Sequence, residues 1–146
     1  MSTQLSADDA RQSMSTHVAL KGAEIRVKYG PQIGWEQLLQ ILQDRSCVRY
    51  PCEVLFDDAG LEPGELAHPE PKGDRPEDGF TLSVRRAFQN DPLAAVFVIL
   101  YQLVLVNYGA FASPDDAETF GASILGIASE EYYQCLCRMA DQIEAT

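Results

Sequence analysis

The sequence predicts an α+β fold in which a small antiparallel sheet carries a buried central helix, with two further C-terminal helices packed on it. Three observations lead to this class. Short apolar segments bounded by turn residues occupy the N-terminal part of the chain. The run from Pro92 to Val106 is apolar and is broken only by Gln102, and two capped amphipathic segments follow it. We expect the helix over Pro92–Asn107 to be the central one, because a helix that is apolar all round must be covered.

Length and charge exclude several classes of function. The 146 residues fit one domain, and the net charge of −11 disfavours binding to nucleic acids or to anionic membranes. A helix over Pro92–Asn107 is about 24 Å long, which is short of the roughly 30 Å hydrocarbon layer of a membrane. The chain shows no basic start followed by an apolar stretch, so we expect reduced cysteine thiols and a cytoplasmic location.

The N-terminal part divides into a tail, a strand and a helix. Residues 1–21 are small and polar without sustained periodicity, which predicts a disordered tail ahead of a single α+β domain over residues 22–146. Glu24–Tyr29 alternates polar and apolar residues as a half-buried strand does, and Gly30-Pro31 ends it. Apolar residues at helical spacing then predict an amphipathic helix over Trp35–Arg45.

Two further strand candidates flank a long polar segment. Cys52–Phe56 is closed by a turn, and Phe80–Val84 alternates large apolar residues with Thr and Ser. Between them, Leu61–Asp78 is rich in proline, glycine and carboxylates. It predicts a surface loop with at most a short extended piece at Glu65–Ala67.

Caps mark the C-terminal helices. Asp91-Pro92 places an N-cap residue before a proline at the first helical position. Ser113-Pro114 repeats the device, with Asp116 three places after the cap as in a capping box, and Gly126 ends that helix. Ser129 begins the last helix, which has an amphipathic pattern.

Histidine, the usual general base, is scarce in this chain. His17 lies in the predicted tail and His68 in the long loop. His68 together with Glu65 and Glu70 has the composition of a metal-ligand set or of a general-base group. We favour a solvated loop histidine, because precise sites need rigid support.

The cysteines do not form a metal motif. Cys47 and Cys52 are marginally spaced for a zinc knuckle. Cys135 and Cys137 are two apart within a helix, so their side chains point about 200° away from each other. We therefore expect no metal and no cofactor. Gly121, in mid-helix, is expected to be a close-packing contact rather than part of a phosphate loop.

The C-terminal part contains one family resemblance. Asp116–Leu125, read Asp-Ala-Glu-Thr-Phe-Gly-Ala-Ser-Ile-Leu, resembles the segment that follows the zinc helix in ImmA/IrrE-type metallopeptidases, which is close to Glu-Ala-Asn-x-Phe-Ala-Ala-x-Leu-Leu. That family has an edge strand and then a helix with the zinc motif His-Glu-x-x-His. Phe80–Val84 and Pro92–Asn107 stand in the same order here. The resemblance covers about a third of the chain and implies a zincin-like fold.

Every chemical position of the zinc motif is altered under this resemblance. The motif works through two imidazoles four residues apart and a glutamate base. Tyr101 and Leu105 stand in place of the imidazoles, and Gln102 in place of the glutamate. The family's third, acidic ligand falls near Asp115 and Asp116. Because one carboxylate does not hold zinc, the resemblance implies a degenerate domain without metal or hydrolytic activity.

Two classes of function remain open. The first is a non-catalytic zincin-like binding or assembly module, whose partner is an unknown protein or a second copy of the chain in a homodimer. Tyr108 and Phe111, just before a helix cap, and Tyr133, on the polar side of the last helix, are its interface candidates. A filled cleft with a large apolar patch elsewhere would favour this class.

The second class is a small-ligand sensor or a non-metal enzyme that uses a remnant cleft around Tyr101, Gln102 and Asp116. A buried glutamine beside a tyrosine is more often a hydrogen-bonded pair than a reaction centre, so we lean against an enzyme. An open pocket with converging polar groups would favour the second class.

Overall fold

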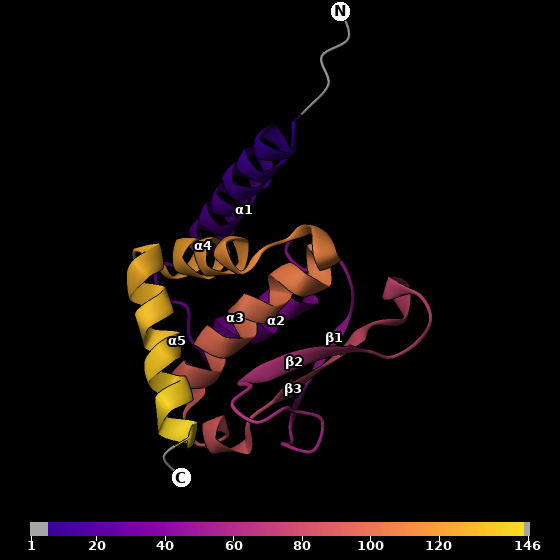
Figure 1. Cartoon of the computed structure of the whole chain (residues 1–146), viewed down its shortest axis with the longest axis vertical. Coiled ribbons are helices and arrows are strands. Elements are labelled where there is room, and N and C mark those ends of the chain that lie inside the picture. Colours follow the sequence, from indigo (N-terminus) through magenta and orange to yellow (C-terminus); the bar gives the residue numbers. More distant parts are fainter. Residues whose placement is uncertain (1–5, 145–146) are drawn as a thin grey trace, which may run out of the picture.

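Helices account for most of the chain, and three short strands form one sheet (Figure 1). The computed structural model describes residues 6–144. A buried helix lies against one face of the sheet, and two C-terminal helices pack around that helix. The α+β class is therefore confirmed.

The sheet contains β1 (Cys52–Phe56), β2 (Ala67–Pro71) and β3 (Phe80–Val84) in the order β1-β3-β2. The first and third of these strands confirm the two predicted ones. β3 runs parallel to β1 and antiparallel to β2, so the sheet is mixed rather than wholly antiparallel. Exposed Glu53 and Leu55 alternate with less exposed neighbours along β1, as expected when a strand has one covered face.

β2 lies inside the segment Leu61–Asp78, for which the sequence predicts a loop because prolines argue against a strand. Its register shows how the prolines fit. The Leu66 carbonyl accepts a hydrogen bond from the Arg85 N–H at 3.0 Å. Since alternate residues of an antiparallel strand bond to the neighbouring strand, Pro69 and Pro71 face the free edge, where β3 requires no N–H donor.

The central helix is α3 (Pro92–Tyr108), as predicted. Its N-cap Asp91 accepts a hydrogen bond from the Ala94 N–H at 3.2 Å, and Gly109 follows its last turn with a φ of 60°. Within the described residues, one helix is long and apolar enough to cross a membrane, namely this one counted to Phe111, and 61% of its apolar segment is buried inside the structure. A mostly buried apolar helix is consistent with the core of a soluble protein.

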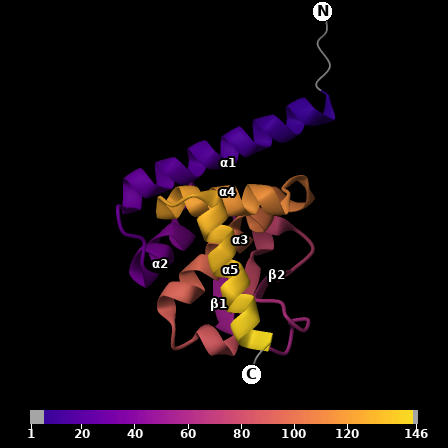
Figure 2. The same cartoon turned by 60° about the vertical axis from the view of Figure 1, so that its left-hand side comes forward.

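The helices α4 (Pro114–Leu125) and α5 (Ser129–Glu144) pack on α3 (Figure 2). Tyr132 anchors α5 to α3: its fully buried ring stacks on the Phe97 ring at a centroid distance of 5.6 Å, and its hydroxyl donates to the Phe97 carbonyl. Gly121 of α4 leaves the necessary space, because a Cβ there would lie 2.5 Å from Cζ of Tyr132. The close-packing role expected of Gly121 is confirmed.

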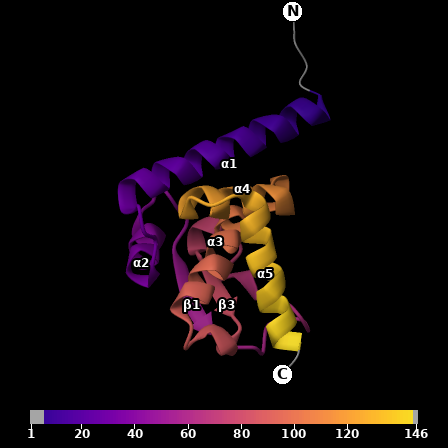
Figure 3. The same ribbon diagram turned by 90° about the vertical axis from the view of Figure 1, so that its left-hand side faces the viewer.

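A single helix, α1 (Ala7–Tyr29), replaces both the tail and the strand predicted for the N-terminus. The prediction of a tail over residues 1–21 is wrong from residue 7 onward, so the domain boundary at residue 22 is wrong too; residues 1–5 lie outside the described residues. α1 lies across α4, and its N-terminal part extends beyond the rest of the molecule (Figures 2 and 3). Its buried residues are Val18, Gly22 and Ile25.

The strand predicted at Glu24–Tyr29 failed because a short alternating pattern also fits part of a helix. Ile25 is 1% exposed whereas Val27 is 87% exposed. Side chains two residues apart point to the same face of a strand but about 200° apart on a helix. The burial therefore follows the helical period.

The predicted amphipathic helix is confirmed as α2 (Trp35–Gln43), which ends slightly before the expected Arg45. Asp44, directly after it, connects α2 to the end of α1. Its carboxylate accepts hydrogen bonds from Nζ of Lys28 at 2.5 Å and from the hydroxyl of Tyr29 at 2.6 Å. Hydrogen bonds from Lys28, and next from Ser46, hold the pKa of the Asp44 carboxyl far below its usual range.

Candidate ligand pocket

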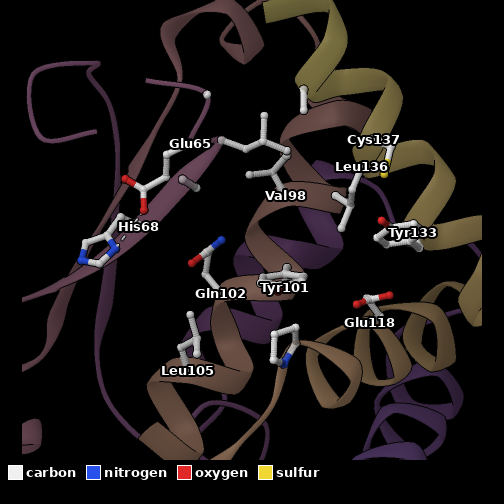
Figure 4. A pocket seen from close by; sticks show the side chains of 15 residues that line it. Glu65, His68, Val98, Tyr101, Gln102, Leu105, Glu118, Tyr133, Leu136 and Cys137 are labelled. Carbon is white, nitrogen blue, oxygen red and sulfur yellow. Dashed lines mark ion pairs between the residues drawn. The ribbon is translucent and has the colours of Figure 1, made fainter. Parts of the chain in front are cut away.

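A pocket of about 440 Å³ lies between β2, α3, α4 and α5 (Figure 4). Its volume falls within the range of roughly 300–1,000 Å³ that is typical of small-molecule sites. The walls are mainly apolar, and each of the four elements also contributes polar side chains. The most important lining residues are Tyr101, Gln102, Leu105, Glu118, Tyr133 and Leu136.

Gln102 is the most informative of these side chains. It is 6% exposed, and among the described residues its amide has no hydrogen-bond partner. The bond to Tyr101 that the sequence suggested does not form. Figure 4 shows the amide directed into the pocket, on the side of β2. The amide offers two donors and an acceptor, and because no fully buried side-chain nitrogen or oxygen of the described residues lacks a partner, these groups open onto the pocket and are available to a ligand.

Glu118 of α4 is the acidic side chain on one side of the pocket, and the neutral Tyr101 of α3 lines the same pocket. Glu118 is partly buried and makes neither a hydrogen bond nor an ion pair with any described residue. Burial, and next the charges of Asp115 and Glu130, raise the pKa of its carboxyl. Burial, and next the charge of Glu118, raise the pKa of the Tyr101 hydroxyl. Both shifts have the direction expected where negative charge lacks a compensating cation.

α5 contributes the wall that faces β2 across the pocket (Figure 4). Leu136 and Ala140 make this wall apolar, and Tyr133 and Cys137 lie one helical turn apart on it. A hydrogen bond to the Cys137 thiol raises the pKa of the Tyr133 hydroxyl. Tyr133 is 46% exposed, and its ring and the unpaired Glu118 carboxylate line the same pocket (Figure 4).

His68 and Glu65 meet on the β2 side of the pocket. Nδ1 of His68 lies 3.4 Å from Oε2 of Glu65, and both residues line the pocket, whereas Glu70 does not. An imidazole held by a carboxylate is the geometry of a general base. No hydroxyl or thiol among the described residues is hydrogen-bonded to this pair, and the His68 side chain is 50% exposed. The pair links the turn before β2, which contains Glu65, to β2, which contains His68.

The three residues that the resemblance aligns with the zinc motif lie together in the structure. Tyr101, Gln102 and Leu105 all line the pocket. The strand arrangement differs from the expectation, because Phe80–Val84 is the central strand of the sheet and not its edge. The edge strand beside the pocket is β2, a segment that the sequence analysis assigned to a loop.

The two acidic candidates lie elsewhere. Asp116 is 7% exposed and caps α4, since its carboxylate accepts a hydrogen bond from the Ser113 N–H at 2.9 Å. Asp115 is exposed and does not line the pocket. Glu118, one turn further along α4, supplies the carboxylate at the pocket instead. Asp115 and Asp116 therefore lie outside the cleft in which the sequence analysis placed them.

The aromatic residues proposed for an interface do not share one surface. Tyr133 lines the pocket. Tyr108 is partly buried: its hydroxyl is hydrogen-bonded to Nε2 of His17 at 2.8 Å, and the guanidinium of Arg49 lies 5.1 Å from its ring centroid. Phe111 is 89% exposed and available to contact another chain. Self-association through Phe111 stays a prediction.

The cysteines are separate free thiols in the structure. Burial raises the pKa of the Cys52 thiol to about 11, so this thiol is protonated at neutral pH. Among the described residues, no group of three or more His, Cys, Asp and Glu side chains is placed to hold a metal ion.

The sequence analysis missed Glu118, Leu136 and Cys137 as pocket residues. Their spacing within α4 and α5 is unremarkable, and no sequence signal states which face of α5 meets α3. No protein-family model, curated protein or solved structure matches this chain. The pocket itself is therefore the basis for an argument about function.

Proposed function

We propose that this protein is a non-catalytic, zincin-like binding module of the cytoplasm that holds a small ligand in the pocket between β2, α3, α4 and α5. The pocket meets the criterion for ligand binding over an assembly surface, because it is open and several polar groups converge in it. The separate free thiols fit a reducing compartment such as the cytoplasm.

Gln102 is the observation that carries this proposal. Among the described residues no fully buried side-chain nitrogen or oxygen lacks a hydrogen-bond partner, so the unpartnered nitrogen and oxygen of the Gln102 amide reach the open space of the pocket. The amide is 6% exposed and faces a pocket with mainly apolar walls. A ligand with a hydrogen-bonding group supplies the missing partner. We therefore assign Gln102 to recognition rather than to stability.

The directions of the pKa shifts in the pocket favour binding over catalysis. A nucleophile is activated by a lowered pKa, whereas the pKa values of the Tyr101 and Tyr133 hydroxyls are raised. Glu118 alone has a shift that suits proton transfer, because its carboxyl pKa is raised by burial. A non-metal enzyme that uses Glu118 as an acid or base is therefore the second candidate.

A zincin ancestry is part of the proposal. It is supported by the shared lining of one pocket by Tyr101, Gln102 and Leu105. Under this ancestry a cleft that once held a metal and substrate has kept its shape and lost its ligands. The cleft itself would then bind a ligand, although the residues that held the metal are gone.

The test is a titration of the full chain with benzyl alcohol, followed by two-dimensional NMR of the backbone amides. We expect saturable shifts at Tyr101, Gln102 and Leu136. Ala140→Phe places a ring in the pocket from a partly buried position of α5, and we expect it to abolish these shifts. Ala10→Phe is the matched control, because Ala10 is an exposed helical alanine far from the pocket lining.

Two results would contradict the proposal. One is the absence of saturable shifts at the pocket with every probe of this size. The other is equal binding by the Ala140→Phe variant and the parent chain.

A further inference from the structure

The pocket combines an unpaired carboxylate with aromatic rings and apolar walls, and this combination defines a ligand class. We propose that the ligand is a small organic ammonium ion, whose N–H groups bind Glu118 beside the rings of Tyr101 and Tyr133 while its apolar body fills the pocket. This inference rests on the proposed binding function and adds the chemical class of the ligand.

Glu118 is the anchor for the positive charge. Its carboxylate lines the pocket, and no described residue gives it a hydrogen bond or an ion pair. The charged neighbours that act on it, Asp115 and Glu130, are both acidic. A partly buried carboxylate surrounded by like charges gains from any cation that reaches it, because hydrogen bonds to charged groups are the strongest that proteins form.

The surroundings of Glu118 select an organic cation over a bare metal ion. A metal ion needs several oxygen, nitrogen or sulfur ligands, and no cluster of three such acidic, His or Cys side chains is present among the described residues. The rings of Tyr101 and Tyr133 instead line the same pocket as the carboxylate (Figure 4). Aromatic faces attract ammonium groups through their negative quadrupole, and the net charge of −11 adds a long-range attraction.

The rest of the pocket fits the apolar body of such a ligand. Val98, Leu105 and Leu136 line the space beyond the charged side. Gln102 lies on the β2 side of the pocket, whereas Glu118 lies on the side of α4, so a ligand that spans the pocket meets both (Figure 4). A ligand with a second polar group at its far end would also satisfy the Gln102 amide.

The ammonium ion is carried by a free molecule rather than by a lysine of an extended peptide. A peptide that docks as an added strand needs backbone donors and acceptors along the free edge. Pro69 and Pro71 face that edge of β2 and have no N–H to donate. The strand beside the pocket is therefore a poor template for a bound peptide backbone.

The experiment compares three probes of equal size on the full chain by calorimetry and NMR: benzylamine, benzyl alcohol and benzoate. We expect benzylamine to bind at least tenfold more tightly than benzyl alcohol, and benzoate to bind weakest. Glu118→Gln removes the charge but keeps the shape, and we expect it to lower benzylamine affinity about tenfold while leaving benzyl alcohol affinity unchanged. Asp115→Asn is the matched control, because it removes the same charge one turn earlier, outside the pocket, and we expect a change below twofold.

The outcomes separate this inference from the proposed function. Equal affinity for benzylamine and benzyl alcohol, or an equal loss of both in Glu118→Gln, overturns the ammonium assignment and leaves the pocket function standing. Failure of all three probes overturns both. A Gly-Lys-Gly peptide that binds more tightly than benzylamine would show that the cation belongs to a protein partner, which contradicts a free ligand. If Asp115→Asn lowered benzylamine affinity as much as Glu118→Gln does, the effect of Glu118 would be one of general surface charge.

Discussion

At the scale of single residues, α3 contains two buried amides with different environments. Asn107 is 5% exposed and fully engaged, since its side chain accepts a hydrogen bond from the Arg49 N–H at 2.9 Å and donates one to the Cys47 carbonyl at 2.9 Å. Gln102 is 6% exposed and has no partner among the described residues. The sequence shows both as polar interruptions of an apolar helix. Only their neighbours in space separate a structural amide from one that is available to a ligand.

This contrast predicts opposite effects of the same kind of substitution. Asn107→Leu leaves the Arg49 N–H and the Cys47 carbonyl without their hydrogen-bond partner, so we expect a loss of about 2 kcal/mol or more in the free energy of unfolding. Gln102→Leu removes an unpaired amide, and we expect no loss or a small gain, on the order of 0.5 kcal/mol. Urea unfolding measures both. A loss in Gln102→Leu as large as that in Asn107→Leu would mean that the protein itself binds the Gln102 amide.

At the scale of elements, α1 shows how far the sequence predicts and where its interpretation failed. The signals for a helix are present: Ser6 and Asp9 form a capping box, with the Asp9 N–H donating to the Ser6 hydroxyl at 3.1 Å. The buried stripe Val18, Gly22 and Ile25 has helical spacing, but a glycine in its middle makes it look polar and small. Gly22 is needed because a Cβ there would lie 2.6 Å from Cβ of Ser123 on α4. The buried face of α1 can therefore be identified only once α4 is known to pack against it.

We predict that the two valines of α1 differ in their contribution to stability. Val18 is 0% exposed, so Val18→Ala is expected to cost about 2 kcal/mol through lost burial and the cavity left behind. Val27 is 87% exposed, so Val27→Ala is expected to change stability by less than about 0.5 kcal/mol. Thermal melts of the two variants check this pair.

Equal melting temperatures for the two valine variants would show that α1 does not pack on α4 in solution.

A truncation tests the N-terminal part of α1. We expect removal of residues 1–12 to leave the melting temperature within about 2 °C of the full chain, because the described residues of that segment are exposed.

At the scale of the whole molecule, the pocket exists because segments far apart in sequence meet around α3. β2 and α3 supply one side, and α4 and α5 the other. The candidates Tyr101, Gln102 and Leu105 could be named from sequence because they share one helix, whose face follows from its period. Glu118 could not be chosen over Asp115 and Asp116, because all three lie in the first turns of α4 and only the packing of that helix decides which carboxylate reaches the pocket.

The proposed zincin ancestry predicts that a metal site can be rebuilt in the pocket. The triple change Tyr101→His, Gln102→Glu and Leu105→His places two imidazoles one turn apart, and Glu118 supplies the third ligand from α4. We expect zinc at about 100 times its dissociation constant to stabilise this variant by roughly 2.7 kcal/mol relative to a chelator. Thermal melts measure the difference.

Two control variants each add one further substitution to the triple variant. Adding Glu118→Gln is expected to remove the zinc effect, and adding Asp115→Asn is expected to preserve it. Identical melts with zinc and with chelator, in a triple variant that still folds, would contradict the assignment of these residues to a lost metal site.

The sequence by itself determined the α+β class, the strands at Cys52–Phe56 and Phe80–Val84, and the positions at which the three C-terminal helices begin. These follow from local causes: alternation, helical spacing and caps act within a few residues, and neighbouring residues suffice to show them. The tertiary structure decided that β3 is the central strand, that Pro69 and Pro71 lie on a free edge, and that Glu118 and Gln102 face a common pocket. Such features depend on contacts between segments that are distant in the chain. Neither segment alone shows which contacts it will make or how strongly they stabilise the fold.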